Sequence, residues 1–186
     1  MNLLYDAFPE TVQVDGISYA VYTDFRNWLR FFDMMADDAY TTTEKVLTSM
    51  RWFREQPPPN LIGAYEALLQ FASRSDAPGE EQESENSHLP QKPCFSWSFD
   101  SAYVLGAFQQ CYQINLRTIP FLHWYHFLAL FDALPDDTPL KKRISYRRIN
   151  TASIKDKTQR IELEKLQQRI AIPCSPLSAE QVGAFF

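Results

Sequence analysis

The chain contains few of the residues on which several classes of enzyme depend. Only 5 of its 186 residues are glycine, and loops that bind phosphate groups through backbone N–H groups are rich in glycine. The sequence accordingly has no GxGxxG pattern, no GxxxxGK followed by Ser or Thr, and no GxSxG. We therefore expect a protein that is not an enzyme and has no catalytic residues.

Cysteine is also scarce. The chain has three cysteines, Cys94, Cys111 and Cys174, which is an odd number, and no two of them have a CxxC spacing. They therefore indicate neither a disulfide framework nor a zinc cluster. His123 and His126 would share one face of a helix, but no clear third metal ligand accompanies them. Histidines that form hydrogen bonds at a bundle surface explain the pair as well. We expect free thiols, no metal site and no cofactor.

Long apolar runs are absent as well. No window reaches the roughly 18 apolar residues that a membrane-spanning helix requires. The first fifteen residues lack the positively charged start and apolar centre of a signal peptide. The sequence therefore predicts a cytosolic protein without a membrane partner.

The composition does support a substantial core. Hydrophobic residues make up 45% of the chain and aromatic residues 15%, which suits a globular domain of this length. Twelve prolines against five glycines indicate short helices separated by stiff breaks. We predict a mainly α fold, a helical bundle of about six to seven helices with an N-terminal β-hairpin, as a single domain over residues 1–186. Two lobes are the alternative.

The N-terminal third shows clear local signals. Residues 11–22 place β-branched and aromatic residues on both sides of Asp15-Gly16, a dipeptide typical of the type I′ turn of a hairpin. Thr23 or Asp24 is then positioned to cap a helix. Its expected apolar face consists of Phe25, Trp28, Leu29, Phe32, Met35 and Ala36.

Two further helices are expected before residue 74. Thr41 and Glu44 form a TxxE capping box, and the helix it begins ends before the prolines at 57–59. Its apolar face is Val46, Leu47, Met50 and Phe53. Residues 60–73 repeat the helical period through Leu61, Tyr65, Leu68, Leu69 and Ala72.

The middle of the chain alternates polar and aromatic segments. Residues 74–93 are acidic and nearly free of apolar side chains, so we predict a disordered insertion there, and a flexible C-terminal tail over 173–186. The alternation in 95–99 (FSWSF) suggests a short strand added to the hairpin. Asp100 or Ser101 then begins a helix bearing Tyr103, Val104, Ala107, Phe108 and Cys111.

An aromatic helix is expected next, from Thr118 and Pro120 to the Leu134-Pro135 step. Its apolar residues cover most of its circumference, which indicates a helix at the centre of a bundle. One face holds Phe121, Trp124, Tyr125, Leu128 and Phe131, and much of the remainder holds Phe127, Leu130 and Leu134.

The charge of the chain is unevenly distributed. The net charge is −5 overall, but residues 141–169 hold 10 Lys+Arg and 3 Asp+Glu, which gives +7. This segment permits contact with an acidic surface or a nucleic-acid backbone, although a solvated helical face explains such charges more often. Its candidate nucleic-acid ligands are Lys141, Lys142, Arg143, Tyr146, Arg147 and Arg148, with Tyr146 stacking on a base.

The helix expected from residue 154 has apolar residues on two opposite sides. Ile154 and Ile161 line one side, and Leu163, Leu166 and Ile170 line the other. One side is then available to a partner or a second copy, unless the helix is wedged between two layers of its own fold. We predict that these five residues, with Arg147, Arg148 and Lys155, bind a protein partner.

The strings MNLLYDAFPETVQVDGISYAVYTDFRNWLRF, FLHWYHFLALFDALPDDT and SYRRINTASIKDKTQR resemble the bacteriophage gene-product-fifteen family. The resemblance covers nearly the whole chain and departs mainly in the acidic segment and the tail beyond Ile172. It implies a siphophage protein of the tail-morphogenesis region, thought to act as a tail assembly chaperone for the tape measure protein. It brings no catalytic residues.

The resemblance suggests a non-catalytic phage tail assembly protein in the host cytoplasm. Its expected partners are tape measure helices or other phage tail proteins, and homo-oligomers are expected too. The alternative is a nucleic-acid-binding or host-interaction phage protein that acts through segment 141–169.

Overall fold

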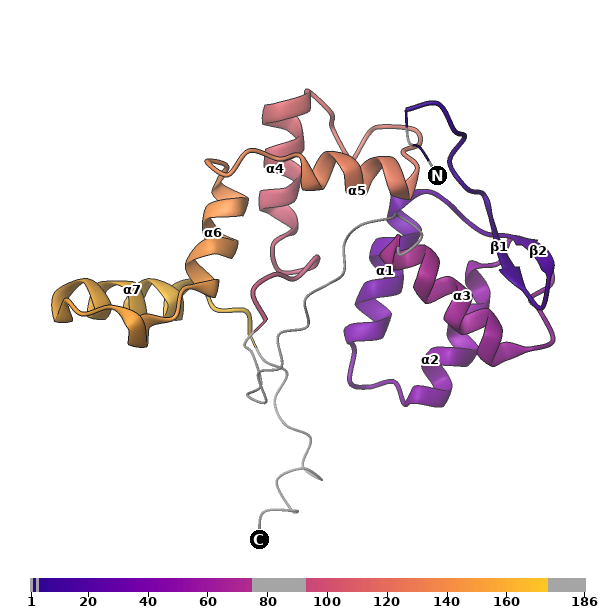
Figure 1. The fold of residues 1–186 in the computed structure, drawn as a ribbon, viewed down its shortest axis with the longest axis horizontal. Helices are drawn as coiled ribbons and strands as arrows, with labels where there is room; N and C mark the ends of the chain where they lie inside the picture. Colours follow the sequence, from indigo (N-terminus) through magenta and orange to yellow (C-terminus); the bar gives the residue numbers. More distant parts are fainter. Residues whose placement is uncertain (1, 3, 75–92, 174–186) are drawn as a thin grey trace, which may run out of the picture. The chain divides into compact units, whose positions relative to one another are not determined.

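The fold is mainly α-helical with one N-terminal β-hairpin, as the sequence predicts (Figure 1). It is known from a computed structural model, which describes residues 2, 4–74 and 93–173. The elements in chain order are β1 (Thr11–Val14), β2 (Ile17–Ala20), α1 (Phe25–Ala36), α2 (Thr42–Ser49), the 3-10 helix η1 (Met50–Trp52), α3 (Leu61–Ser73), α4 (Ser101–Tyr112), α5 (Trp124–Asp132), α6 (Pro139–Arg148), the 3-10 helix η2 (Thr151–Ser153) and α7 (Lys157–Ile170).

The contacts divide the chain into two compact units. The hairpin unit comprises residues 1–90 and 108–134, and the α6–α7 unit comprises residues 91–107 and 135–186. Helix α4 contributes its first seven residues to the α6–α7 unit and its last five to the hairpin unit. The expectation of a single domain over 1–186 stays a prediction. The expected disordered insertion and tail lie almost entirely outside the described residues.

The hairpin forms at the predicted turn. Asp15 and Gly16 have φ angles of 51° and 80°, the two positive values that a type I′ turn requires. The register pairs Val14 with Ile17 and Thr11 with Ala20. Val12 and Val14 on alternate positions of β1 are buried, so one face of the hairpin belongs to the core.

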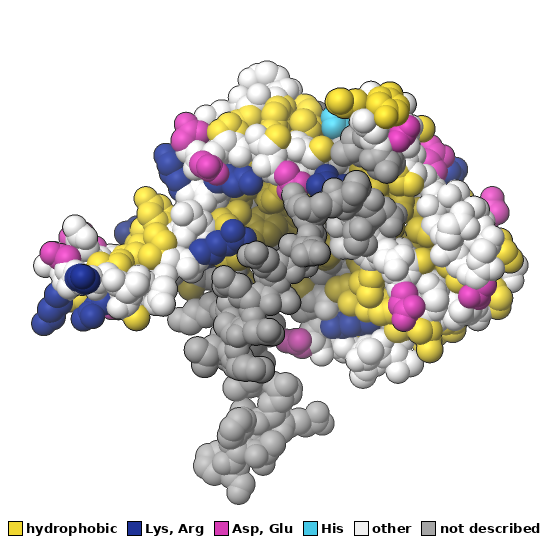
Figure 2. All heavy atoms as spheres, viewed as in Figure 1, with side chains coloured by type: hydrophobic (Ala, Val, Ile, Leu, Met, Phe, Trp, Pro, Cys, Tyr) yellow, Lys and Arg dark blue, Asp and Glu magenta, His cyan; other side chains and the backbone are white. Residues whose placement is uncertain are grey.

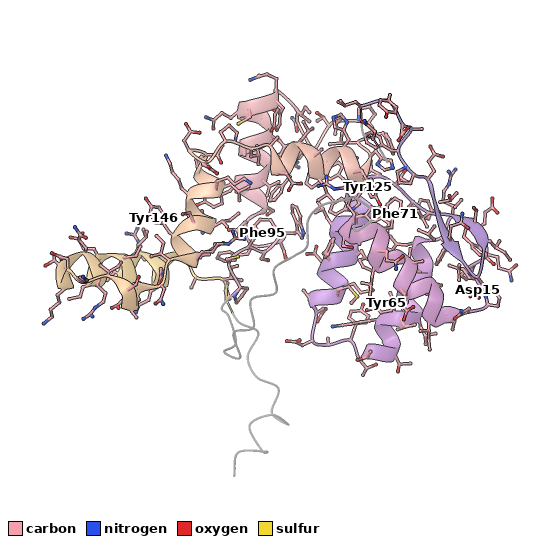
Figure 3. The ribbon with its side chains drawn as sticks, viewed as in Figure 1. Asp15, Tyr65, Phe71, Phe95, Tyr125 and Tyr146 are labelled. Carbon is pink, nitrogen blue, oxygen red and sulfur yellow. The ribbon has the colours of Figure 1, made fainter. Side chains whose placement is uncertain are left out.

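Helix α1 supplies a large share of the aromatic core. The Asp24 side chain caps it by accepting a hydrogen bond from the Arg26 N–H at 2.9 Å. Its buried residues are Phe25, Trp28, Phe31 and Met34, so the buried face is rotated from the predicted one. Trp28 stacks on Phe71 of α3 with ring centroids 4.8 Å apart. In Figure 3, Phe71 and Tyr125 of α5 also lie together, with ring centroids 4.9 Å apart.

The predicted apolar face of α2 is wrong at Leu47, which is exposed, while Ser49 is fully buried. The capping box of Thr41 and Glu44 is confirmed, since both of its hydrogen bonds form. The α-helix ends at Ser49 and continues as η1. That tighter turn changes the helical period, so Phe53 reaches the core from extended backbone after it.

The aromatic helix begins later than predicted. Helix α5 starts at Trp124, and neither Thr118 nor Pro120 is part of it. The residues before it are tied to the start of α1: the Phe25 N–H donates to the Leu122 carbonyl at 2.9 Å, and the Trp124 N–H donates to the Thr23 carbonyl at 2.7 Å. Phe121, which was expected on the apolar face, is consequently 53% exposed.

The predicted strand over residues 95–99 does not form. Within the described residues the sheet contains only β1 and β2. Ser96 and Asp100 instead close a turn, in which the Asp100 N–H donates to the Ser96 carbonyl at 2.9 Å and the Asp100 carboxylate accepts from the Ser96 N–H at 3.2 Å. Two local hydrogen bonds of this kind compete with strand pairing, and the turn leads directly into α4.

We predict that Phe127→Ala lowers the free energy of unfolding by about 3–5 kcal/mol, because it removes a ring from a close-packed core. Phe127 is fully buried and stacks on Phe25 and Phe108. The matched control is Phe121→Ala at the exposed position, which should cost less than about 1 kcal/mol. Urea denaturation followed by circular dichroism measures both, and equal losses would contradict this account of the core.

Candidate partner-binding surfaces

The residues that the sequence predicts as partner contacts all lie in the α6–α7 unit. Helix α6 begins at Pro139, and the Thr138 hydroxyl caps it by accepting from the Lys141 N–H. Helix α7 begins at Lys157 after the Asp156 cap. Ile154 was expected on this helix, but it lies before it, as the residue that follows η2, because the helix begins only after its Asp156 cap.

Arg147 joins three segments of this unit. Its guanidinium donates to the two carboxylate oxygens of Asp100 at 2.6 and 2.8 Å, to the Cys94 carbonyl at 3.0 Å and to the Ile170 carbonyl at 2.7 Å. The side chain of Arg147 is 4% exposed and that of Asp100 is fully buried. A buried charge pair of this kind is stable only when its remaining hydrogen-bonding groups are satisfied, and here backbone carbonyls satisfy them.

A second side chain fixes the same joint from the opposite helix. The Gln167 amide of α7 donates to the carbonyls of Tyr146 and Ile149 at 2.8 Å each. The carbonyls at a helix C-terminus have no partner within the helix. Each helix therefore caps the C-terminal end of the other, since Arg147 of α6 reaches the Ile170 carbonyl of α7.

The same contacts occupy part of the candidate nucleic-acid surface. Arg147 is paired with Asp100, and Arg143 lies 3.6 Å from the Asp100 carboxylate, with its guanidinium 4.2 Å from the centre of the Tyr103 ring. Lys142 and Arg148 are exposed, and Lys141 is half-buried. Two of the five basic residues proposed for this role thus face an internal carboxylate, which leaves less free positive charge than the sequence suggests.

The two sides of α7 differ in burial. Leu163 and Leu166 are half-buried and Ile170 is buried, so this side is covered by its own unit at Ile170 and only partly covered at Leu163 and Leu166. Ile161 lies on the other side and is 39% exposed. Lys155, before the helix, is exposed and Ile154 is half-buried.

Apolar side chains are exposed where α6 meets α7. Tyr146 is 40% exposed and Ile149 is 37% exposed. Figure 2 shows hydrophobic side chains gathered at this junction and Lys and Arg side chains along α7, and Figure 3 labels Tyr146 on α6. We call Tyr146, Ile149, Leu163 and Leu166 the junction surface. Ile149, which follows directly after the basic run, was not among the predicted contacts.

Helix α3 of the hairpin unit presents a second apolar surface, which was not predicted from the sequence. Its inner face is buried through Ala64, Ala67, Leu68, Phe71 and Ala72. Its outer face carries Leu61, Ile62 and Leu69, and Ile62 is 69% exposed. Leu61 and Leu69 belong to the predicted helical repeat but are exposed. The composition of this helix could have indicated the second surface, because Glu66 is the only charged residue among its 13 residues. A helix that is apolar on all sides is normally covered on all sides.

His123 has a structural role in the hairpin unit. Its Nδ1 accepts from the Tyr125 N–H at 3.1 Å and thereby caps α5, and its Nε2 lies 3.0 Å from the Pro9 carbonyl. Because the carbonyl only accepts, Nε2 carries the proton and the ring is neutral. Burial lowers the pKa of His123 below its usual value, against an opposing effect of the Pro9 hydrogen bond.

Two of the three cysteines lie in the part of the chain that the structure describes. Cys94 and Cys111 are free thiols, while Cys174 lies outside the described residues. The described part of the chain contains no group of three or more His, Cys, Asp or Glu side chains placed to hold a metal ion. None of its helices is long and apolar enough to cross a bilayer.

The structure thus defines a mainly helical protein with apolar side chains exposed on helices of both units. The chain belongs to the Bacteriophage Gp15 protein family, whose sequence pattern matches residues 4–172. The resemblance to this phage family is confirmed. No curated protein and no solved structure matches the chain.

We predict that Arg147→Met destabilises the protein by about 3 kcal/mol, because it leaves the buried Asp100 carboxylate without its main partner. Arg148→Met is the matched control: Arg148 is exposed and donates a hydrogen bond to the Cys94 sulfur, so its loss should be below about 0.5 kcal/mol. Urea denaturation of both variants measures the difference. Similar losses would show that Arg147 does not hold the unit together.

The pKa of His123 predicts a pH dependence of stability. A folded-state pKa below the unfolded value means that the unfolded chain binds the proton more readily. The contribution of His123 is therefore complete above about pH 6.5, its unfolded pKa, and is lost as the pH falls towards the folded pKa.

The matching experiment compares His123→Asn with His126→Asn. Asn keeps a capping oxygen without titrating, so the drop in unfolding free energy between pH 7.5 and 5.5 should be smaller in His123→Asn than in the wild type. His126 is exposed, and its charge is only a minor cause of the lowered pKa of His123, so its substitution should reduce the drop much less. A wild-type drop in His123→Asn would refute the assignment.

Proposed function

We propose that this phage protein is a non-catalytic tail assembly chaperone that keeps helices of the tape measure protein soluble until the tail tube polymerises. The observation that carries the proposal is the exposed apolar junction surface in a unit whose helices are rigidly joined by Arg147 and Gln167. Amphipathic helices bind such surfaces through apolar residues spaced three and four positions apart. A long helical tape measure protein contains many amphipathic helices and would aggregate without a protein that binds them.

The charges around the junction surface suit a partner helix with acidic flanks. Lys142, Arg148 and Lys155 are exposed in the same unit. Charges at the rim of an interface orient a partner and raise its association rate more than they raise affinity. The chaperone would act in the host cytoplasm, where the tail proteins are made.

The experiment is co-expression with the tape measure protein of the same phage, followed by pull-down and measurement of the soluble fraction. The wild type should form a complex and increase the amount of soluble tape measure protein. A Tyr146→Ser/Ile149→Ser double variant should lose most of this effect, because it removes the exposed apolar part of the junction surface. Phe121→Ser, at an exposed aromatic residue of the hairpin unit, is the matched control.

Two results would count against the proposal. The first is an absence of both complex and solubilisation with the wild type. The second is an equal loss in the Phe121→Ser control, which would mean that the junction surface is not the binding site.

The second candidate function is nucleic-acid binding through segment 141–169, motivated by its charge of +7. Counterion release would make such binding fall steeply with salt, whereas capture of an apolar helix would weaken little. A gel-shift titration at several salt concentrations separates the two. Tight, salt-sensitive binding that is lost in Lys142→Glu/Arg148→Glu would favour the second candidate.

A further inference from the structure

The exposed outer face of α3 requires an explanation, because the helix is apolar on both sides. Among the described residues of α3, the buried ones all lie on its inner face. Ile62 and Leu69 are seven residues apart and share an outer face about two turns long, and the exposed Leu61 lies at its edge. A surface of this kind on a rigid helix is suited to a second helix.

Symmetric pairing of two copies of α3 is disfavoured. Glu66 is exposed, lies within the span of the outer stripe and is the only charged residue of the helix. Two α3 helices packed about a two-fold axis near their centres would bring two Glu66 carboxylates together, which is a repulsive arrangement. The partner helix should therefore carry positive charge beside an apolar side chain.

The outer side of α7 in this chain has that character. Ile161 is exposed there, and Lys157 and Lys165 lie one turn before and one turn after it on the same side. Helices α3 and α7 have 13 and 14 residues, so both are about 20 Å long. A lysine lies on each side of Ile161, so either direction of packing offers one to Glu66.

The charges of the two units are complementary as well. The described residues of the hairpin unit hold 11 Asp+Glu and 7 Lys+Arg, and those of the α6–α7 unit hold 6 and 10. Opposite net charges of −4 and +4 favour contact between unlike units of different copies over contact between like units.

We propose that the outer face of α3 binds the outer side of α7 from a second copy of the chain, with Ile62 against Ile161 and Glu66 beside a lysine. The contact is heterologous, because it joins two different surfaces. Each copy can therefore bind one neighbour through α3 and another through α7. Repetition of such a contact produces a ring or an open chain of copies. The junction surface is not used and stays available to a partner.

The test is sedimentation velocity of the full chain over a wide concentration range at low and high salt. The wild type should associate, and association should weaken as salt rises. Ile62→Lys should weaken it by roughly tenfold or more, while Phe121→Lys should not change it.

Charge reversal tests the pairing directly. Glu66→Lys alone and Lys157→Glu/Lys165→Glu alone should each weaken association roughly three- to tenfold. Mixing the two variants should restore it, because every contact between unlike variants is again between opposite charges. Lys142→Glu/Lys155→Glu changes the net charge of the same unit by as much as Lys157→Glu/Lys165→Glu, but at other exposed positions. It should weaken association less, and mixing it with Glu66→Lys should not restore association.

Three results would overturn the proposal: a monomer at all concentrations, association that neither reversal weakens, or weakened association that mixing does not restore. Circular dichroism confirms that each variant is folded. The experiment contains no tail protein, so a negative result would not contradict the proposed chaperone function. A failure of the co-expression test would likewise not contradict the proposed contact between copies.

Discussion

The α6–α7 unit depends on one buried charge pair. Asp100 lies before α4 and Arg147 near the end of α6, and their contact brings together segments separated by 47 positions in the chain. The guanidinium also satisfies carbonyls of Cys94 and Ile170. A purely apolar contact would allow α7 to slide or rotate, whereas hydrogen bonds with fixed directions allow one arrangement. The exposed side chains of α6 and α7 are therefore held in a defined geometry, which favours binding because little freedom is lost on association.

Local signals predicted the elements well where the decisive interactions are also local. The Asp15-Gly16 turn, the capping box of Thr41 and Glu44 and the helix beginning near Asp100 each depend on residues within a few positions of one another. Such interactions form in the same way whatever the tertiary context. The number of helices and the hairpin therefore follow from the sequence.

Predictions failed where distant backbone decides the outcome. Helix α5 begins at Trp124 and not at Pro120 because the preceding residues bond to the start of α1, almost one hundred positions earlier in the chain. The period of α7 suggested two apolar sides but not which one is covered, since that depends on the joint made by Arg147 and Gln167. Neither contact has a signature in the spacing of residues. Within the basic run, nothing local distinguishes the buried Arg147 from the exposed Arg148.

The outer face of α3 can be recognised as an unusual surface only when its composition and its exposure are considered together. From the sequence, a helix with Glu66 as its only charge belongs inside a core. From the structure, Ile62 is exposed while residues on the opposite face are closely packed. Exposed apolar stripes of this size promote aggregation unless they are covered. The chain also has a second exposed apolar surface, at the junction of α6 and α7. In the proposed contact between copies, the opposite charges of the two units would select which surface each one binds.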